Sequence, residues 1–282
     1  MSYQTLIDAA DLARLVEQGD VLVCDCRFDL NDPESGRRDY GAGHVPGAVY
    51  VDLEQDLSGV PNGTNGRHPL PDRTAFAARM AELGATQIGL VVAYDTSGAY
   101  YASRLWWMLR WAGHGQVAVL DGGLGAWVKS GRALEQGENQ APAGDFQASA
   151  EPRMAISEVE EIEANLRDGE LLVVDARTAE RFAGAPHPLD TASGHIPGAS
   201  NRFWQNNLTA DGRFKPAETL AAEFQALLGE RDPATTVHQC GSGVTATHNL
   251  LAMEIASLGG SRLYPGSWSE WTSDPRRPVA KD

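Results

Sequence analysis

The residues best suited to chemistry form one short run, Cys240-Gly241-Ser242-Gly243-Val244-Thr245. The run follows a β-branched segment, 235–239, and leads into an apolar helical pattern from Val244 to Leu258. Glycines allow backbone N–H groups to converge on one point, and the amino end of a helix adds positive potential there. Such a loop favours the thiolate over the thiol. The run therefore predicts a nucleophilic Cys240, with Gly241, Gly243, Val244 and Thr245 as the substrate-binding residues of its loop. The alternative is a cysteine that is merely buried at a helix start.

The composition limits where such chemistry takes place. With 282 residues, the chain is long enough for two domains. Its formal net charge of -15 argues against nucleic acid and anionic membranes as partners. No apolar stretch approaches the length of a membrane span, and the N-terminus lacks the pattern of a signal peptide. We expect a cytoplasmic protein.

The remaining cysteines and the histidines give no sign of a metal or cofactor. Cys24 and Cys26 lie two positions apart on a predicted strand, so they face the same side and form no relaxed disulfide. The seven histidines show no pair at a spacing typical of metal ligands. The sequence therefore predicts neither a metal site nor a cofactor.

An internal duplication organises the chain. The motif Gly43-His44-Val45-Pro46-Gly47-Ala48 returns as Gly194-His195-Ile196-Pro197-Gly198-Ala199. Each copy follows a strand that ends in Asp-x-Arg, and strands alternate with helical patterns in both halves, which predicts α/β domains with mainly parallel sheets. We expect a first domain over 1–138, a linker over 139–152 and a second domain over 153–282. Because these histidines and Asp-x-Arg pairs occur in both copies, we expect them to be structural.

The two copies differ at the position of the nucleophile. The predicted strand 89–94 enters the loop 95–100, which corresponds to the loop that starts at Cys240, so Asp95 replaces the cysteine. A carboxylate in a ring of N–H donors is a satisfied anion and no soft nucleophile. We therefore expect chemistry in the second domain alone. Predicted helices include 74–83, capped by Asp72, and 99–111.

At this point the chain resembles the tandem-domain rhodanese family of thiosulfate and 3-mercaptopyruvate sulfurtransferases, from about Leu6 to Trp271. The resemblance rests on Tyr40-Gly-Ala-Gly-His-Val-Pro-Gly-Ala-Val-Tyr-Val51, on Tyr264-Pro-Gly-Ser-Trp-Ser-Glu-Trp271 and on the cysteine loop, which looks like that of the mercaptopyruvate branch. It implies two rhodanese-like domains, each a mainly parallel sheet flanked by helices. It also implies an inactive first domain and a catalytic second one.

By this resemblance, Cys240 takes the sulfur of 3-mercaptopyruvate as a persulfide and releases pyruvate. The sulfur then passes to cyanide, a thiol or a reduced thioredoxin. A Ser–His–Asp relay implied by the family maps to Ser242, His68 and Asp52, and Arg181 matches the arginine that binds the substrate carboxylate. The internal duplication makes a monomer plausible.

Several alternatives stay open. His68 is alternatively an exposed loop histidine, and Asp52 a strand-end or helix-cap carboxylate with Glu54 as its competitor. Arg181 is alternatively part of a surface ion pair. Relatives of the mercaptopyruvate type usually carry a second arginine where this chain has Leu189, so another cation substitutes, the affinity for mercaptopyruvate is lower, or the preferred donor differs.

Three other functions compete with this assignment. Thiosulfate:cyanide sulfurtransferase is the nearest alternative, since it uses the same cysteine. A cysteine phosphatase needs an arginine six positions after the cysteine, where this chain has Ala246. A non-catalytic rhodanese-like module, a sulfur carrier or a binding domain, is disfavoured by the presence of Cys240 and its complete loop.

Overall fold

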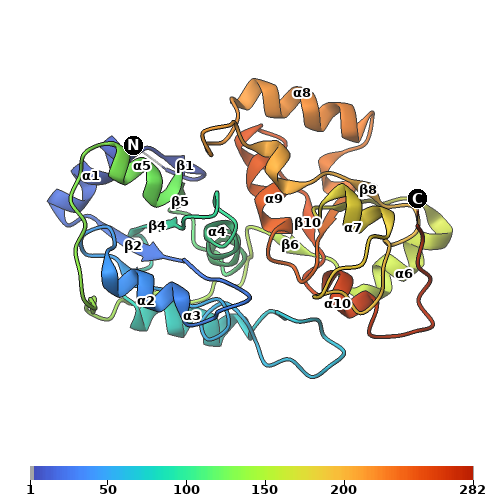
Figure 1. Ribbon diagram of the computed structural model, residues 1–282, viewed down its shortest axis with the longest axis horizontal. Coiled ribbons are helices and arrows are strands. Elements are labelled where there is room, and N and C mark those ends of the chain that lie inside the picture. The colour runs from blue at the N-terminus through green and yellow to red at the C-terminus, as the bar shows by residue number, and fades with distance from the viewer. Residues whose placement is uncertain (1–2, 282) are drawn as a thin grey trace. The chain divides into compact units, whose positions relative to one another are not determined.

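The computed structural model describes residues 3–281, which form two compact units (Figure 1). Unit 1 contains the chain up to Ser58 together with Pro71–Arg153 and Ala210–Phe214, and unit 2 contains Gly59–Leu70, Met154–Thr209 and the chain from Lys215 onward. The short segment 59–70 therefore belongs to the second unit although its flanking residues belong to the first.

Unit 1 is a five-stranded parallel sheet with the strand order β1-β5-β4-β2-β3. Its elements in chain order are β1 (Leu6–Ile7), α1 (Ala9–Gln18), β2 (Val21–Asp25), α2 (Ser35–Ala42), β3 (Val49–Tyr50), α3 (Arg73–Glu82), β4 (Leu90–Tyr94), α4 (Ala102–Trp111), β5 (Val117–Leu120) and α5 (Gly123–Lys129). The alternation of strands and helices that the sequence predicts is confirmed here.

Unit 2 repeats this topology with the strand order β6-β10-β9-β7-β8, again all parallel. Its elements are β6 (Ala155–Ile156), α6 (Val159–Asp168), β7 (Leu172–Asp175), α7 (Ala179–Ala183), β8 (Ser200–Asn201), the 3-10 helix η1 (Trp204–Asn207), α8 (Ala217–Leu228), the 3-10 helix η2 (Pro233–Thr235), β9 (Thr236–Gln239), α9 (Ala246–Ile255), β10 (Arg262–Leu263) and α10 (Ser267–Trp271). Each unit is thus the α/β fold expected from the duplicated sequence.

The helix ends follow local chemistry more closely than the apolar pattern. Asp72 caps α3 as predicted, since its carboxylate accepts the N–H groups of Thr74 and Ala75. The helices predicted to start at Ala99 and Val244 start later, at Ala102 and Ala246, because the preceding residues form the loops that leave β4 and β9. Ala99 has a φ of 70°, which a right-handed helix excludes.

The Asp-x-Arg pairs have the structural role that the duplication suggests. In unit 1 the guanidinium of Arg27 donates to the carboxylate of Asp25 and to the carbonyl of Gly43, so the end of β2 is tied to the Gly-His-Val-Pro-Gly turn. The same bonds recur in unit 2 among Arg177, Asp175 and Gly194. A buried charge pair with a further carbonyl acceptor satisfies most of its donors and fixes the turn.

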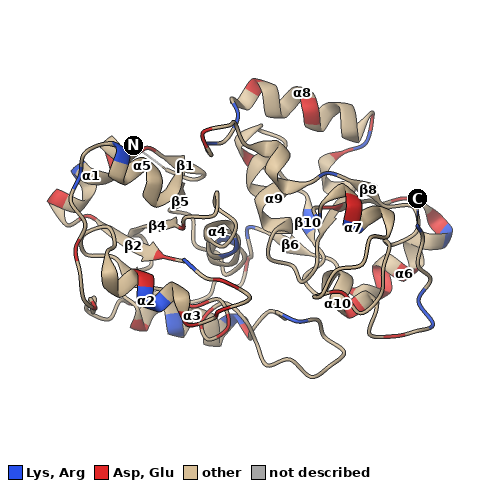
Figure 2. Ribbon diagram, in the orientation of Figure 1, with Lys and Arg blue, Asp and Glu red and all other residues tan. Residues whose placement is uncertain are grey.

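Helix α9 sets the position of the loop that precedes it. Residues 246–253 are all buried, and the helix carries a single charged side chain, Glu254, near its end (Figure 2). A helix that is enclosed in this way has one position relative to β9, so the loop between them is held at both ends.

The segment predicted as a linker is bound along unit 1. Its backbone donates from Asn139 to the hydroxyl of Tyr40 and from Gly144 to the carbonyl of Ala81, and Phe146 is buried. The division between the units falls between Arg153 and Met154. In residues 3–281 we find no helix with the length and hydropathy needed to cross a membrane.

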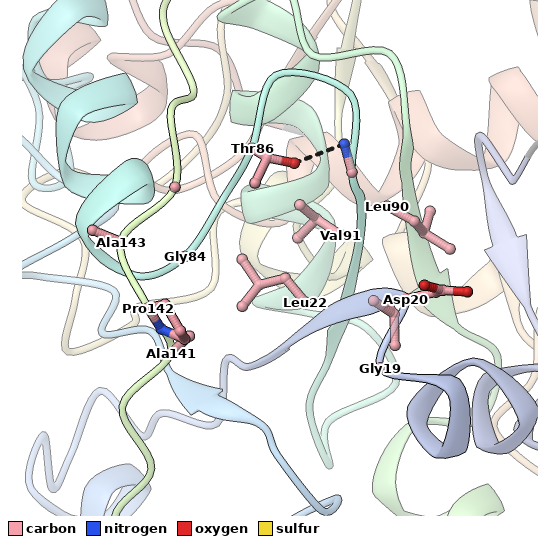
Figure 3. A pocket seen from close by; sticks show the side chains of 13 residues that line it. Gly19, Asp20, Leu22, Gly84, Thr86, Leu90, Val91, Ala141, Pro142 and Ala143 are labelled. Carbon is pink, nitrogen blue, oxygen red and sulfur yellow. Dashed lines mark hydrogen bonds between the residues drawn. The ribbon is translucent and has the colours of Figure 1, made fainter.

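Unit 1 contains a groove of about 480 Å³ at the amino ends of β2 and β4. Figure 3 shows the side chains that line it. The groove is lined by glycines and small apolar side chains, including Leu22, Ala141 and Pro142, and Thr86 closes one side by accepting the N–H of Gly89. Ligands of parallel α/β sheets bind at the carboxyl ends of the strands, so the groove lies at the opposite end from the expected site.

Candidate active site

Cys240 lies where a parallel sheet offers its binding site. It directly follows β9, the central strand of the second sheet, and the loop it begins ends at α9. Cys240 keeps 2% of its surface exposed and Ser242 keeps 4%, so a donor has a narrow approach to the sulfur. The three cysteines are free, and burial raises the pKa of Cys24 and of Cys26 well above the ordinary range. Cys24 and Cys26 are therefore poor candidates for a nucleophile.

The loop is clamped by the amino end of α10. The carbonyls of Cys240 and Gly241 accept the N–H groups of Trp268 and Ser269, each at 3.0 Å. Gly243 has a φ of 75°, and a Cβ atom there would overlap the carbonyl of Pro265, so only glycine fits. The conformation of the loop is thus dictated by backbone contacts.

Ser267 is a second clamp, which the sequence does not reveal. Its hydroxyl accepts the N–H of Cys240 at 3.1 Å and donates to the carbonyl of Tyr264 at 2.9 Å. It is fully buried and has a φ of 54°, a left-handed conformation that costs energy for any residue except glycine. Its counterpart in unit 1 is Gly123, with a φ of 58°. The strain is retained at the position that holds the nucleophile.

The loop of unit 1 that corresponds to the cysteine loop holds a carboxyl group. The carboxylate of Asp95 accepts four backbone N–H groups at 2.8–3.0 Å, from Ser97, Ala99, Tyr101 and Ala102. Burial raises the pKa of Asp95, and the four donors oppose that shift. The loop thus surrounds an anion with backbone donors, as the sequence suggests for this position.

The four backbone positions that donate to Asp95 have counterparts in the loop of Cys240, although the N–H of Thr247 donates there to the carbonyl of Val244 at 3.2 Å. A shift of 145 positions, taken from the numbers of the two residues, aligns Asp95 with Cys240 and the four donors with Ser242, Val244, Ala246 and Thr247. Gly98 and Gly243 have nearly equal φ values, 73° and 75°, and Leu124 donates to the carbonyl of Asp95 at 3.0 Å as Trp268 does to that of Cys240. The second loop is therefore built like one that holds an anion.

His68 lies beside this loop. Its Nδ1 is 2.8 Å from the Oγ of Ser242, and its side chain is buried rather than exposed in a loop. The segment 59–70 is closed by the bond from Gly59 N–H to the carbonyl of Pro69 and belongs to unit 2. A hydroxyl and an imidazole at this distance can exchange a proton.

Asp52 lies in the other unit and has a local role there. Its Oδ1 accepts the N–H groups of Glu54 and Gln55, and its own N–H donates to Asp56. Asp52 therefore caps the turn after β3, in agreement with the alternative that the sequence left open. Its part in a relay stays a prediction.

Arg181 comes from α7 and reaches the cysteine loop. A Cβ atom placed on Gly241 would lie 3.3 Å from its Nη2. The same guanidinium donates to both carboxylate oxygens of Asp190, at 2.9 and 2.6 Å, and Arg177 also approaches Asp190. Arg181 therefore does form an ion pair, as the alternative interpretation expected, but this pair is partly buried and lies at the cysteine loop rather than on the open surface.

Arg67 is the residue that the sequence reasoning missed. Its Nη2 would lie 3.4 Å from a Cβ atom on Gly241, and its Nη1 donates to the carbonyl of Leu189 at 2.7 Å. Its position directly before His68 was the only available signal. Two guanidinium groups, Arg67 and Arg181, therefore meet at the second residue of the loop.

The other histidines near β9 and α9 have structural contacts. Burial, with a smaller effect of Arg202, lowers the pKa of His238 to about 3, so this ring is neutral. His248 lies against the ring of Trp204, and its Nδ1 is 3.2 Å from the amide nitrogen of Asn207. Within residues 3–281 no three His, Cys, Asp or Glu side chains form a group able to hold a metal ion.

The comparisons with known proteins agree with this fold. The family model of the rhodanese-like domain matches residues 8–130 and 158–274. The chain therefore belongs to the rhodanese family and contains two copies of its domain. Each copy has the five-stranded parallel sheet described above.

Relatives of full length are sulfurtransferases by name. A probable 3-mercaptopyruvate sulfurtransferase of Pseudomonas aeruginosa is 46% identical over 282 residues, covering 99% of both chains. The putative thiosulfate sulfurtransferase SseB of Mycobacterium tuberculosis is 37% identical over 279 residues, covering 99% of this chain and 97% of the relative. The crystal structure of SseA from Escherichia coli, described as a 3-mercaptopyruvate sulfotransferase, has a TM-score of 0.80 at 33% identity and covers 93% of this chain and 98% of that one.

Proposed function

We propose that the protein is a sulfurtransferase that takes sulfur from 3-mercaptopyruvate. The thiolate of Cys240 attacks the substrate sulfur, an S–S bond forms and the C–S bond breaks. The electron pair of that bond stays on carbon as the pyruvate enolate, which takes up the proton of the substrate thiol and leaves as pyruvate. Cys240 then holds the outer sulfur as a persulfide anion. Cyanide, a small thiol or reduced thioredoxin takes this sulfur and restores the thiolate.

The observation that carries the proposal is the pair of matching loops. Asp95 is a buried carboxyl group that accepts four backbone N–H groups, and Cys240 occupies the corresponding position in unit 2. Donors that are fixed before the reaction stabilise developing charge without reorganisation. A thiolate and a persulfide are both anions that this loop accommodates.

We assign the proton transfer to Ser242 and His68. The Ser242 hydroxyl adjoins the cysteine loop, and His68 at 2.8 Å is its exchange partner. Such a pair can carry the proton that the enolate needs. Asp52 is the proposed third member of this relay.

We assign the substrate-binding arginine, the oligomeric state and the location of the protein on the same basis. Arg181 binds the substrate carboxylate, for which a planar guanidinium fork is well suited. Cys240, Ser242, His68 and Arg181 come from a single chain, which supports activity as a monomer. The free cysteines fit the reducing cytoplasm, where acceptor thiols are abundant.

Thiosulfate is the second candidate donor, because the relative from Mycobacterium tuberculosis carries that name. Turnover with both donors at one enzyme concentration separates the two functions. We expect a higher kcat/KM with 3-mercaptopyruvate, measured as pyruvate release. A clear preference for thiosulfate would reverse the assignment.

The nucleophile is tested by replacing it. After incubation with 3-mercaptopyruvate and removal of excess donor, mass spectrometry should find one additional sulfur atom on Cys240. Cys240→Ser should release no pyruvate, whereas Cys24→Ala, a buried cysteine of unit 1, should retain activity. Pyruvate release by Cys240→Ser at the rate of the unchanged protein would exclude this mechanism.

The relay has its own test. Ser242→Ala and His68→Asn should each lower kcat with 3-mercaptopyruvate by about 10²–10⁴-fold, the usual contribution of proton transfer. Their effect with thiosulfate should be smaller, because thiosulfate leaves as sulfite and needs no proton on carbon. Asp52→Asn compared with Glu54→Gln tells whether Asp52 takes part. Equal losses with both donors would argue against a relay.

A further inference from the structure

Arg67 is fixed against unit 2 by its own backbone. Its N–H donates to the Oγ of Ser269 at 3.0 Å, and Ser269 in turn donates to the carbonyl of Gly241. The preceding Gly66 has a φ of 86°, and a Cβ atom there would lie 2.8 Å from the carbonyl oxygen of Gly266. The segment 59–70 contains no other Lys or Arg and no Asp or Glu (Figure 2). This segment therefore contributes one positive charge, that of Arg67, beside the cysteine loop.

The guanidinium of Arg67 is held by neutral groups. Its Nη1 donates to the carbonyl of Leu189, its Nε is buried without a partner, and within the described residues 3–281 no carboxylate lies within 4.0 Å of it. Arg181, by contrast, donates from its Nε and its Nη2 to the carboxylate of Asp190. The two cations at the loop thus differ in how far their charge is already neutralised.

A count of the neighbouring charges leads to the same conclusion. The connected group contains three guanidinium ions, Arg67, Arg177 and Arg181, and two carboxylates, Asp175 and Asp190, so one positive charge is left over. Because the two carboxylates pair with Arg177 and Arg181, the excess charge resides on Arg67. The pKa of nearby His187 is lowered by burial and then by Arg181; Asp190 opposes this shift, and Arg67 and Arg177 add smaller contributions to it, so the neutral form of the ring is favoured.

Arg67 is also reachable by a small molecule. It lines a groove of about 430 Å³ together with Pro61, Pro188, Leu189 and Ser269. Leu189 occupies the position where a second arginine was expected, and it contributes its backbone carbonyl as the anchor of Arg67 instead. Another part of the chain thus places a guanidinium group at Leu189.

We infer that Arg67 is the main binding residue for the carboxylate of the sulfur donor, and that Arg181 is the second guanidinium group that contacts this carboxylate. The inference rests on the proposed function and specifies the donor class as a small monocarboxylate whose sulfur lies a few bonds from its charge. A single excess positive charge matches a single carboxylate. Arg67 therefore determines affinity and selects anionic over neutral reagents.

Alkylation of Cys240 tests this without any sulfur transfer. Iodoacetate and iodoacetamide both form an S–C bond and expel iodide, but only iodoacetate carries a carboxylate. Arg67→Met should lower the ratio of the iodoacetate rate to the iodoacetamide rate about tenfold or more, as expected for one charge-assisted hydrogen bond. Arg67→Lys should give a ratio between those of Arg67→Met and the unchanged protein, since lysine keeps the positive charge but lacks the two parallel N–H donors of the guanidinium group. Arg276→Met, at an exposed arginine of unit 2, is the matched control and should leave the ratio unchanged.

Steady-state kinetics give the second readout. With 3-mercaptopyruvate, Arg67→Met should raise KM about tenfold or more with a smaller change in kcat, and should weaken inhibition by pyruvate in parallel. If Arg67→Met left the ratio of the iodoacetate rate to the iodoacetamide rate unchanged, even with both rates lowered, the role of Arg67 would be overturned. Because alkylation needs no sulfur donor, an enzyme that failed to use 3-mercaptopyruvate would refute the proposed function and still leave the anion site measurable.

Discussion

Gly243→Ala tests whether the cysteine loop is fixed by its backbone contacts. Two penalties are expected from the structure. The first is the left-handed φ of 75°, which costs an alanine roughly 1–2 kcal/mol. The second is the overlap of the new Cβ atom with the carbonyl of Pro265, which adds about 1–3 kcal/mol, as overpacking does elsewhere. The total loss of stability should be about 2–5 kcal/mol.

Gly169→Ala is the matched control in the same unit. Gly169 has a φ of 67° at the end of α6, and a Cβ atom there meets no other atom within 4 Å, so it pays the first penalty alone. Urea unfolding of both variants should show Gly243→Ala as the less stable by about 1–3 kcal/mol. A loop displaced by about 1 Å should also lower kcat/KM roughly 10²-fold, with Gly169→Ala unaffected. Equal stability and full activity of both variants would show that Pro265 does not constrain the loop.

Two further predictions concern residues around β9. Ser267→Ala and Ser267→Gly both lose the hydrogen bond to the N–H of Cys240, so both variants should lose activity. Only glycine relieves the strained φ of 54°, so Ser267→Gly should be more stable than Ser267→Ala by about 1 kcal/mol in urea unfolding. Equal stability of the two variants would show that Ser267 is not strained. Folding lowers the pKa of His238 from its ordinary value of 6.5 to about 3. Between pH 6.5 and pH 3 the unfolded chain therefore binds a proton that the folded protein does not, and the folded protein loses stability as the pH falls through this interval. The loss should reach about 2 kcal/mol at pH 5, and His238→Phe should remove this part of the pH dependence; an unchanged slope of unfolding free energy with pH would refute it.

The fold could be predicted because its signals are local and occur twice. Each copy contains a strand that ends in Asp-x-Arg, a Gly-His-x-Pro-Gly turn and a strand that enters a glycine loop. The difference at Asp95 was equally visible, since a single shift aligns the two loops. The starts of α4 and α9 were placed too early, because residues such as Ala99 adopt loop conformations that an apolar pattern cannot reveal.

The arrangement of the charged residues could not be predicted in the same way. Arg67 contacts Leu189, which is 122 positions away, and no periodicity links two such loops. Arg181 was predicted through the family resemblance, but its pairing with Asp190 became visible only in the structure. Ser267 had no signal either, since its role depends on a φ value and a contact with Cys240 across 27 positions.

Cys240→Asp provides the most direct test of the anion cradle. In an apolar site a buried carboxylate costs several kcal/mol compared with alanine, whereas a ring of N–H donors compensates for its lost hydration. Asp95 already occupies such a ring in unit 1 with four donors. We therefore expect Cys240→Asp to be inactive and yet at least as stable as Cys240→Ala at pH 7, with Cys240→Asn less stable than Cys240→Asp because its amide nitrogen cannot accept hydrogen bonds. If Cys240→Asp proved less stable than Cys240→Ala by more than about 2 kcal/mol, the donors around Cys240 would not form the site that Asp95 displays.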